Sequence, residues 1–149
     1  MNKSFKGAIQ ADSSQTIKLS TNNGLTGYKI KKLNVIGQQP SALDQESTFK
    51  IFSSKNNTIA STIDFNDPTL LAVAFYETED TTTLAENANI VFDNMVFSQD
   101  IELTMKGTAD RVLNYYLELE QVKLSENEAT MATLKDMRAG PSSFAPWTN

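Results

Sequence analysis

The stretch LNYYLELE, residues 113–120, decides the fold. Its odd-numbered positions hold three leucines and a tyrosine, whereas its even-numbered positions hold an asparagine, a tyrosine and two glutamates. A period of two is typical of a β-strand that turns one face to a core and the other to water. The stretch therefore predicts a long strand and indicates a fold built on sheets.

Shorter stretches with strand character lie before it along the chain. We expect strands at residues 5–9, 17–19, 28–35, 49–51, 59–65, 70–76, 90–96 and 101–105. One extra residue between Ile30 and Leu33 reverses the inward face, which predicts a β-bulge. About eight strands separated by turn residues, without alternating helices, predict a mainly β fold. The expected architecture is an antiparallel β-sandwich of jelly-roll-like topology.

One helix is expected after the last strand. Residues 125–128, SENE, form a capping box in which the serine hydroxyl and the last glutamate satisfy exposed backbone amides. A narrow apolar stripe follows at helical spacing, and Gly140 with Pro141 ends the helix. These signals predict a C-terminal helix over residues 125–139, which completes a single domain over residues 1–139.

Residues 140–149 are expected to form an extended C-terminal arm. The arm has no charged side chain, and Pro141 and Pro146 favour polyproline II geometry. With about three residues per turn, Phe144 and Trp147 then point to the same side. Large aromatic rings on an uncharged segment need a surface on which to bury themselves. These two prolines and two aromatic residues are therefore the candidate partner-binding residues, and the arm can dock on its own domain or on a neighbouring subunit.

Composition excludes several classes of chemistry. The chain of 149 residues and 16.5 kDa has no cysteine and no histidine, which removes thiol nucleophiles, disulfides, zinc fingers and the Ser-His-Asp triad. No apolar run approaches the roughly 18 residues of a membrane span, and the first residues lack the apolar segment of a secretory signal. A net charge of −5 argues against direct nucleic-acid binding. We expect no catalytic, cofactor-binding or metal-binding residue, no cofactor and no enzymatic activity.

Charge is distributed unevenly along the chain. Residues 1–60 carry eight lysines and three acidic residues, whereas residues 61–149 carry five basic and fifteen acidic residues. Either the two parts interleave in the folded domain, or a basic patch on one subunit meets an acidic patch on its neighbour. Lys29, Lys31 and Lys32 pose a similar choice, because they can form a basic patch or protect the edge of a sheet. We favour the edge role.

Two pairs of carboxylates have the composition of the acid pairs of glycoside hydrolases. They are Asp93 with Asp100 and Glu118 with Glu120. The second pair falls on the outward face of its strand, where polar residues normally face water.

Residues 64–67, DFND, contain fragments of a calcium loop without its glycine and terminal glutamate. A turn explains them better, and an acid-dependent hydrolase is only a third hypothesis.

Tyrosines provide the signal for another class of function. β-Sandwiches that bind carbohydrate stack sugars on exposed aromatic rings, and Tyr28, Tyr115 and Tyr116 are the candidates here. Because all three lie in expected strands, some of them have to be buried. A glycan-binding module is therefore the alternative to a structural protein.

The segment from Arg111 to Gly140, RVLNYYLELEQVKLSENEATMATLKDMRAG, resembles the C-terminal ends of small structural proteins in the virions of marine tailed bacteriophages. The asparagine- and threonine-rich composition without cysteine or histidine is similar to theirs. The resemblance implies a β-sandwich protein of the phage head that decorates or cements the capsid by bridging neighbouring capsid subunits.

The resemblance also implies the partners and the location. The partners are the major capsid protein or other virion proteins, and the location is the virion after assembly in the host cytoplasm. Closed symmetry is the norm for homo-oligomers, so we expect a homo-oligomer, with a trimer as the first geometry to test. A neck or tail position is the alternative within the particle. No direct contact with nucleic acid or membrane is expected.

Overall fold

The structure, a computed structural model, describes residues 2–19, 25–39, 44–55, 57–78, 85–92 and 95–124. These residues contain eight strands and no helix. The strands are β1 (Asn2–Gln10), β2 (Ser13–Ile17), β3 (Thr26–Gly37), β4 (Gln45–Phe52), β5 (Leu70–Thr78), β6 (Ala85–Val91), β7 (Ile101–Gly107) and β8 (Val112–Lys123). The prediction of a mainly β fold is confirmed for this part of the chain.

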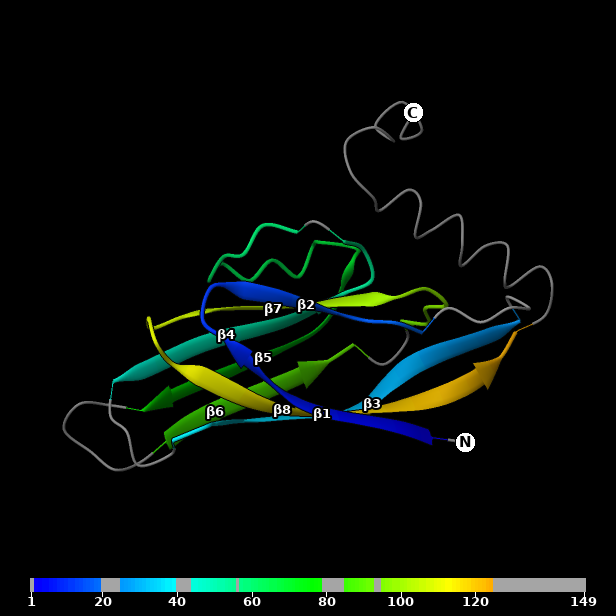
Figure 1. Ribbon diagram of the computed structural model, residues 1–149. Coiled ribbons are helices and arrows are strands. Elements are labelled where there is room, and N and C mark those ends of the chain that lie inside the picture. The colour runs from blue at the N-terminus through cyan, green and yellow to red at the C-terminus, as the bar shows by residue number, and fades with distance from the viewer. Residues whose placement is uncertain are drawn as a thin grey trace.

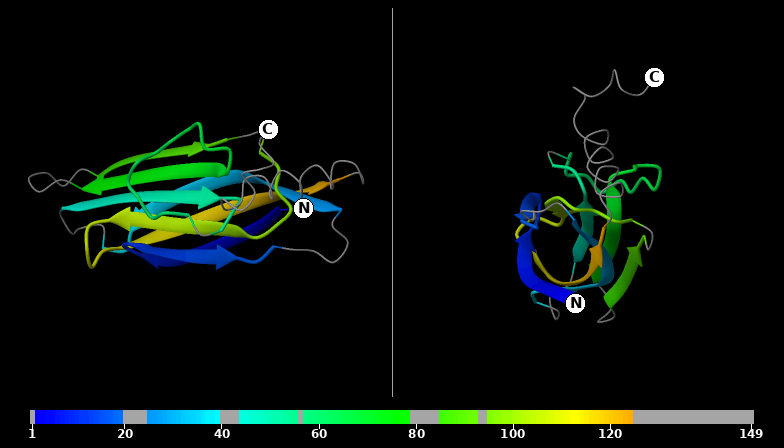
Figure 2. Two further views of the ribbon diagram at one scale, coloured as in Figure 1. Left: turned by 90° about the horizontal axis from the view of Figure 1, so that it is seen from above. Right: turned by 90° about the vertical axis from the view of Figure 1, so that its right-hand side faces the viewer.

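The strands form two antiparallel sheets, which face each other as a β-sandwich (Figures 1 and 2). The small sheet has the order β1-β8-β3, and the large sheet has the order β2-β7-β4-β5-β6. The chain passes from one sheet to the other at Asp12, whose φ of 60° is left-handed, a conformation that aspartate tolerates. The Asp12 amide donates to the Met105 carbonyl on β7 at 2.8 Å, and the Ala11 amide donates to the Arg111 carbonyl at 3.0 Å. This corner therefore ties both sheets together.

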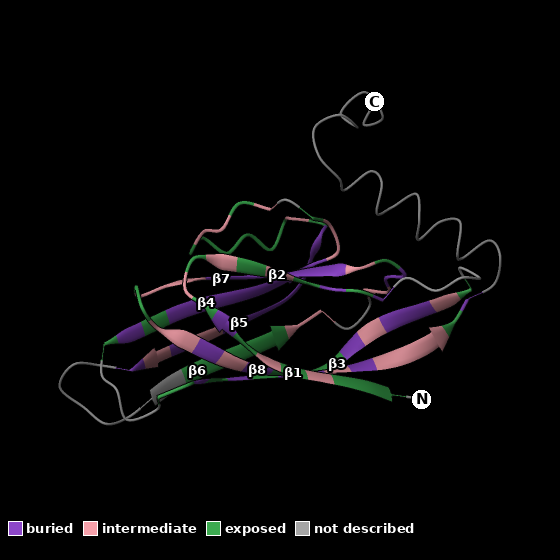
Figure 3. Ribbon diagram, viewed as in Figure 1, coloured by how far each residue is buried: buried purple, intermediate pink, exposed green. Residues whose placement is uncertain are grey.

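The core lies between the sheets and is formed by their inward residues. Leu113 and Leu117 of β8 are fully buried, and Figure 3 shows buried segments along the facing strands. Across the sandwich, the ring of Tyr115 stacks on Phe49 of β4 with centroids 5.5 Å apart. Burial of side chains of this size contributes roughly 1.5–3 kcal/mol each, which explains why the alternating stretch at residues 113–120 determines the fold.

The predicted β-bulge is present in β3. Ile30 lies opposite Leu119 and Leu33 lies opposite Leu117, with a register shift between Ile30 and Lys32. Both Ile30 and Leu33 are buried. The extra residue thus keeps the side chains on both sides of the bulge pointing to the core.

The prediction of a strand at residues 59–65 is wrong. The segment has no strand pairing, and Ile63 and Phe65 are exposed. It belongs to the connection between β4 and β5, which runs over the outer face of the large sheet (Figure 1). Lys50 of β4 donates a hydrogen bond from Nζ to the Thr62 carbonyl. A side chain, rather than a neighbouring strand, therefore satisfies this backbone group, and the apolar alternation does not reflect a sheet.

The strand predicted at residues 90–96 lies earlier in the chain. β6 begins at Ala85, opposite Thr78 of β5, and ends at Val91, opposite Ala72. β6 is the edge strand of the large sheet. An edge strand is paired on one side only and lies partly in water, so it needs no apolar alternation. This explains why residues 85–89, AENAN, form part of a strand although they show no apolar alternation.

The predicted C-terminal helix at residues 125–139 and the arm at residues 140–149 lie outside the described residues. The same is true of the candidate partner-binding residues Pro141, Phe144, Pro146 and Trp147. Within the described ranges, no helix is long and apolar enough to cross a membrane.

Candidate functional site

The outer face of the small sheet carries an open hollow that extends over all three strands. Six outward side chains surround it: Lys6, Ala8, Asn34, Ile36, Asn114 and Tyr116. The strand register places Lys6, Tyr116 and Asn34 in one row across the sheet. The volume is about 580 Å³, within the range of small-molecule sites. We call this feature the Tyr116 hollow.

Of the three candidate tyrosines, Tyr116 alone lies at the surface. Tyr28 is fully buried and Tyr115 is 8% exposed, whereas Tyr116 is 37% exposed. Tyr115 donates its hydroxyl to Gln15 Oε1 at 3.1 Å, and burial raises the pKa of Tyr115. The Tyr116 hydroxyl donates to Glu118 Oε2 at 3.2 Å. Because Glu118 lies two residues further along the same face, this hydrogen bond draws the Tyr116 side chain along β8.

Three polar side chains beside this ring have no partner in the part of the chain that the structure describes. Lys6, Asn34 and Asn114 form no side-chain hydrogen bond or ion pair with another described residue. An amide side chain offers two donors and an acceptor oxygen, and an ammonium group offers three donors. The hollow thus combines an aromatic face with unused hydrogen-bonding groups. Sequence reasoning named Tyr116 but missed these three residues, because the pairing of distant strands brings them together.

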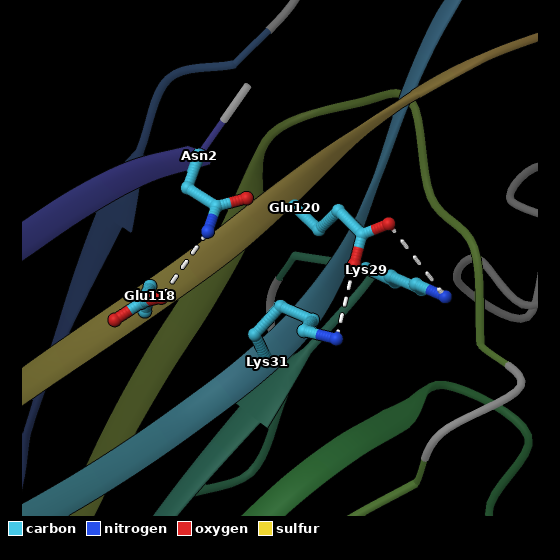
Figure 4. A network of polar contacts seen from close by, with 5 residues as sticks. All are labelled: Asn2, Lys29, Lys31, Glu118 and Glu120. Carbon is cyan, nitrogen blue, oxygen red and sulfur yellow. Dashed lines mark hydrogen bonds and ion pairs between the residues drawn. The ribbon is translucent and has the colours of Figure 1, made fainter.

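The carboxylates of β8 have partners within the small sheet (Figure 4). Glu118 Oε1 accepts a hydrogen bond from Asn2 Nδ2 at 3.3 Å. The Glu120 carboxylate lies 3.1 Å from Lys31 Nζ and 4.0 Å from Lys29 Nζ. The hydrogen bond from Lys31, together with the charges of Lys29 and Lys31, lowers the pKa of Glu120. Glu120 is therefore ionised at neutral pH, whereas the general acid of a glycosidase needs a raised pKa.

Asp100, from the other candidate pair, has a structural partner on each oxygen. Its Oδ1 accepts a hydrogen bond from the Leu19 amide at 2.7 Å, and its Oδ2 lies 3.6 Å from Lys55 Nζ. Asp93 lies outside the described residues. The Lys55–Asp100 pair, like the two ion pairs of Glu120, joins the basic first part of the sequence to the acidic second part. The two parts therefore interleave in these pairs, as one of the two interpretations of the charge pattern predicts.

A second candidate surface lies on the outer face of the large sheet. Ile63, Phe65 and Ile90 are 40%, 56% and 42% exposed. The Phe65 ring packs edge-to-face on Phe92 with centroids 5.1 Å apart, and Phe92 continues the outward face of β6 from Ile90. Ile63 lines an adjacent hollow of about 470 Å³ together with Phe75 of β5. We call Ile63, Phe65, Ile90 and Phe92 the Phe65 patch.

Buried polar groups hold the segment that carries this patch. Lys50, which donates to the Thr62 carbonyl, is buried. Burial lowers the pKa of Lys50, and the charge of Asp67 opposes that shift. Glu102 is also buried, and its Oε1 accepts hydrogen bonds from the Asn57 backbone amide and from Asn57 Nδ2, both at 3.0 Å. These contacts attach the connection between β4 and β5 to the large sheet.

The acidic residues that contain fragments of a calcium loop form a turn, as predicted. Asp64 Oδ1 accepts from the Asn66 amide at 2.9 Å. Asp67 Oδ1 accepts from the Thr69 amide at 2.8 Å and from the Thr69 hydroxyl at 2.6 Å. In the described part of the chain, no cluster of three or more acidic, histidine or cysteine residues could hold a metal ion.

Comparisons with known proteins show no family for this chain. No family model matches the sequence, and no curated protein matches it. Among solved structures, it matches a tailspike protein from Acinetobacter baumannii bacteriophage Fri1, a capsular polysaccharide depolymerase, with 9% identity and a TM-score of 0.23. The match covers 83% of this chain and 20% of that chain, so the chain spans about a fifth of the tailspike. A TM-score this low supports no conclusion about fold or function.

Proposed function

We propose that the chain is a non-enzymatic structural protein of a phage particle, which decorates or cements the head by bridging neighbouring capsid subunits. The virion context comes from the resemblance of residues 111–140 to phage structural proteins. The observation that carries the proposal is the Phe65 patch, because clustered apolar side chains at a surface mark protein-binding sites. Phe65, at 56% exposure, is its most exposed member.

The strand order supports a jelly-roll-like interpretation of the sandwich. β1 pairs with β8 and β2 pairs with β7, so the first strands pair with the last, as in a nested jelly roll. β6 remains paired with β5 at the edge of the large sheet. Asn87 of β6 nevertheless reaches the small sheet, because its Nδ2 donates to the Val35 carbonyl of β3 at 3.2 Å.

The mechanism of the proposed function is the burial of surface between subunits. Each copy, as part of a trimer or another homo-oligomer, contacts two or more copies of the major capsid protein, so that separating them exposes additional apolar surface. The Phe65 patch provides one contact, and the arm at residues 140–149, with Phe144 and Trp147, provides another. A neck or tail protein would use the same contacts in fewer copies per particle.

Co-sedimentation with particles that lack this chain tests the patch. The double variant Ile63→Ser/Phe65→Ser is expected to bind about tenfold or more weakly, as for the loss of a well-packed interface anchor. The matched control is Ile36→Ser, which removes an isoleucine that is exposed at least as much as Ile63 from the opposite face. Unchanged binding of the double variant would exclude the patch as the capsid contact.

The same assay tests the arm with Phe144→Ala/Trp147→Ala, which should weaken attachment while the isolated domain stays folded.

Mass spectrometry of purified particles then tests the location. A copy number that is a simple fraction of the major capsid protein supports head decoration, whereas a few copies per particle support the neck or tail. Absence from the particle would refute a virion role.

A further inference from the structure

We infer that the Tyr116 hollow is a saccharide-binding site, in which the Tyr116 ring stacks on a pyranose and the polar side chains beside it bind the sugar hydroxyls. This inference concerns the small sheet and is independent of the proposed attachment through the large sheet.

The orientation of the ring is the first reason. A tyrosine on a sheet normally stands away from the strands, but the hydrogen bond from its hydroxyl to Glu118 Oε2 holds Tyr116 along β8. The ring is therefore a partly exposed aromatic platform whose rotation this hydrogen bond restricts before any ligand arrives. Fixing the platform in advance lowers the entropic cost of binding. The C–H-rich face of a pyranose fits such a platform, because aromatic faces are apolar and carry partial negative charge.

The second reason is the set of groups around the ring. Lys6 and Asn34 lie on either side of Tyr116 in its row, and Asn114 lies two residues before it on the same face. None of these three side chains has a partner among the described residues. Amides act as donors and acceptors at once, which suits hydroxyl groups that do the same. The surface of the hollow is mostly apolar, so the apolar face of a pyranose can lie on it while the sugar hydroxyl groups reach these three side chains.

Heteronuclear NMR titration of the full chain tests the inference. The probes are three soluble neutral tetrasaccharides: cellotetraose, maltotetraose and chitotetraose. At least one is expected to give saturable shifts confined to residues 6–8, 34–36 and 114–116. Shifts elsewhere on the molecule, or no saturable shift with any probe up to about 10 mM, a range that already covers weak binding, would overturn the inference.

Variants at Tyr116 separate stacking from a general effect on the fold. Tyr116→Ala removes the ring and should weaken binding about tenfold or more. Tyr116→Phe keeps the ring but loses the hydrogen bond to Glu118, so its affinity should lie between those of Tyr116→Ala and the unmodified chain. Asn114→Ala should weaken binding several-fold, because one hydrogen-bonding group is lost. The variant Phe65→Ser, on the opposite face, is the matched control and should bind like the unmodified chain. Equal binding by Tyr116→Ala and the unmodified chain would also overturn the inference.

Discussion

The ring of Tyr115 lies against the α-carbon of Gly7, across the pairing of β8 with β1. A β-carbon built on Gly7 would lie 2.7 Å from the Tyr115 hydroxyl oxygen and 2.9 Å from the ring carbon that carries it. The glycine thus makes room for a ring that also stacks on Phe49 of the opposite sheet and bonds to Gln15. One small residue on an edge strand therefore determines how both sheets pack.

Replacement of this glycine should destabilise the domain. Gly7→Ala forces Tyr115 out of its position, and overpacking of this kind costs about 1–3 kcal/mol. Urea unfolding followed by far-UV circular dichroism measures the change. Ala8→Ser, on the outward face next to it, is the control and should change the free energy of unfolding by less than about 0.5 kcal/mol. Equal effects of the two substitutions would show that the ring can move aside without cost.

Removal of the buried Glu102 carboxylate should lower the free energy of unfolding, although Glu102 lies outside the hydrophobic core. Glu102→Ala leaves two donors of Asn57 without their acceptor, which costs about 1–3 kcal/mol for buried groups. Native-state hydrogen exchange should show faster exchange at the Asn57 amide. The exposed Glu46 provides the matched control, because its side chain forms no hydrogen bond or ion pair with other described residues. If Glu46→Ala and Glu102→Ala lower the free energy of unfolding equally, the contact between Glu102 and Asn57 does not stabilise the fold.

Lys50 should give the protein a stability that rises with pH in the alkaline range. Burial lowers the pKa of the folded-state ammonium below 10.5, so the unfolded chain binds a proton that the folded chain has already lost. Between the two pKa values, stability therefore increases with pH. The stability of the unmodified chain relative to that of Lys50→Met should therefore increase as the pH approaches 10.5. Thermal unfolding of both proteins over this pH range measures the change. A difference independent of pH would mean that Lys50 titrates normally.

The lysines of β3 should keep the molecule from associating through that strand. β3 is an edge strand of the small sheet, and charged side chains and bulges both hinder edge-to-edge pairing. The triple variant Lys29→Thr/Lys31→Thr/Lys32→Thr should self-associate with increasing concentration in analytical ultracentrifugation. Its net charge changes from −5 by three further units, which by itself favours monomers. Self-association would thus be due to the unprotected edge, and a monomeric triple variant would contradict the edge role.

Local patterns were sufficient to predict the strands that form the core. The alternation along β8 and the extra residue between Ile30 and Leu33 each reflect burial of a single face. Burial of one face produces an alternation of apolar and polar residues in the sequence, because polar side chains are excluded from the buried face. The mainly β fold could therefore be predicted from a few stretches.

Contacts between distant residues could not be predicted in the same way. The apolar alternation at residues 59–65 belongs to the connection between β4 and β5, in which Ile63 and Phe65 are exposed. A hydrogen bond from the Lys50 side chain to the Thr62 carbonyl attaches this connection to the large sheet. The strand β6 has no apolar alternation because it lies at an edge. The orientation of Tyr116 depends on a hydrogen bond to Glu118, and the free groups around it come from three strands. None of these arrangements has a signature in the local sequence.

The central position of β8 has a consequence for the synthesis of the protein. β8 lies between β1 and β3, so the ribosome makes both outer strands of the small sheet long before the strand that joins them. The small sheet is therefore completed only after residue 123 has left the exit tunnel, and the long separation in sequence between partners favours slow folding. Until then, the segments that become β1 and β3 carry five lysines and no acidic residue, and these like charges repel each other. This repulsion disfavours premature pairing of the two segments, and Glu120 of β8 forms ion pairs with Lys29 and Lys31 when the sheet closes.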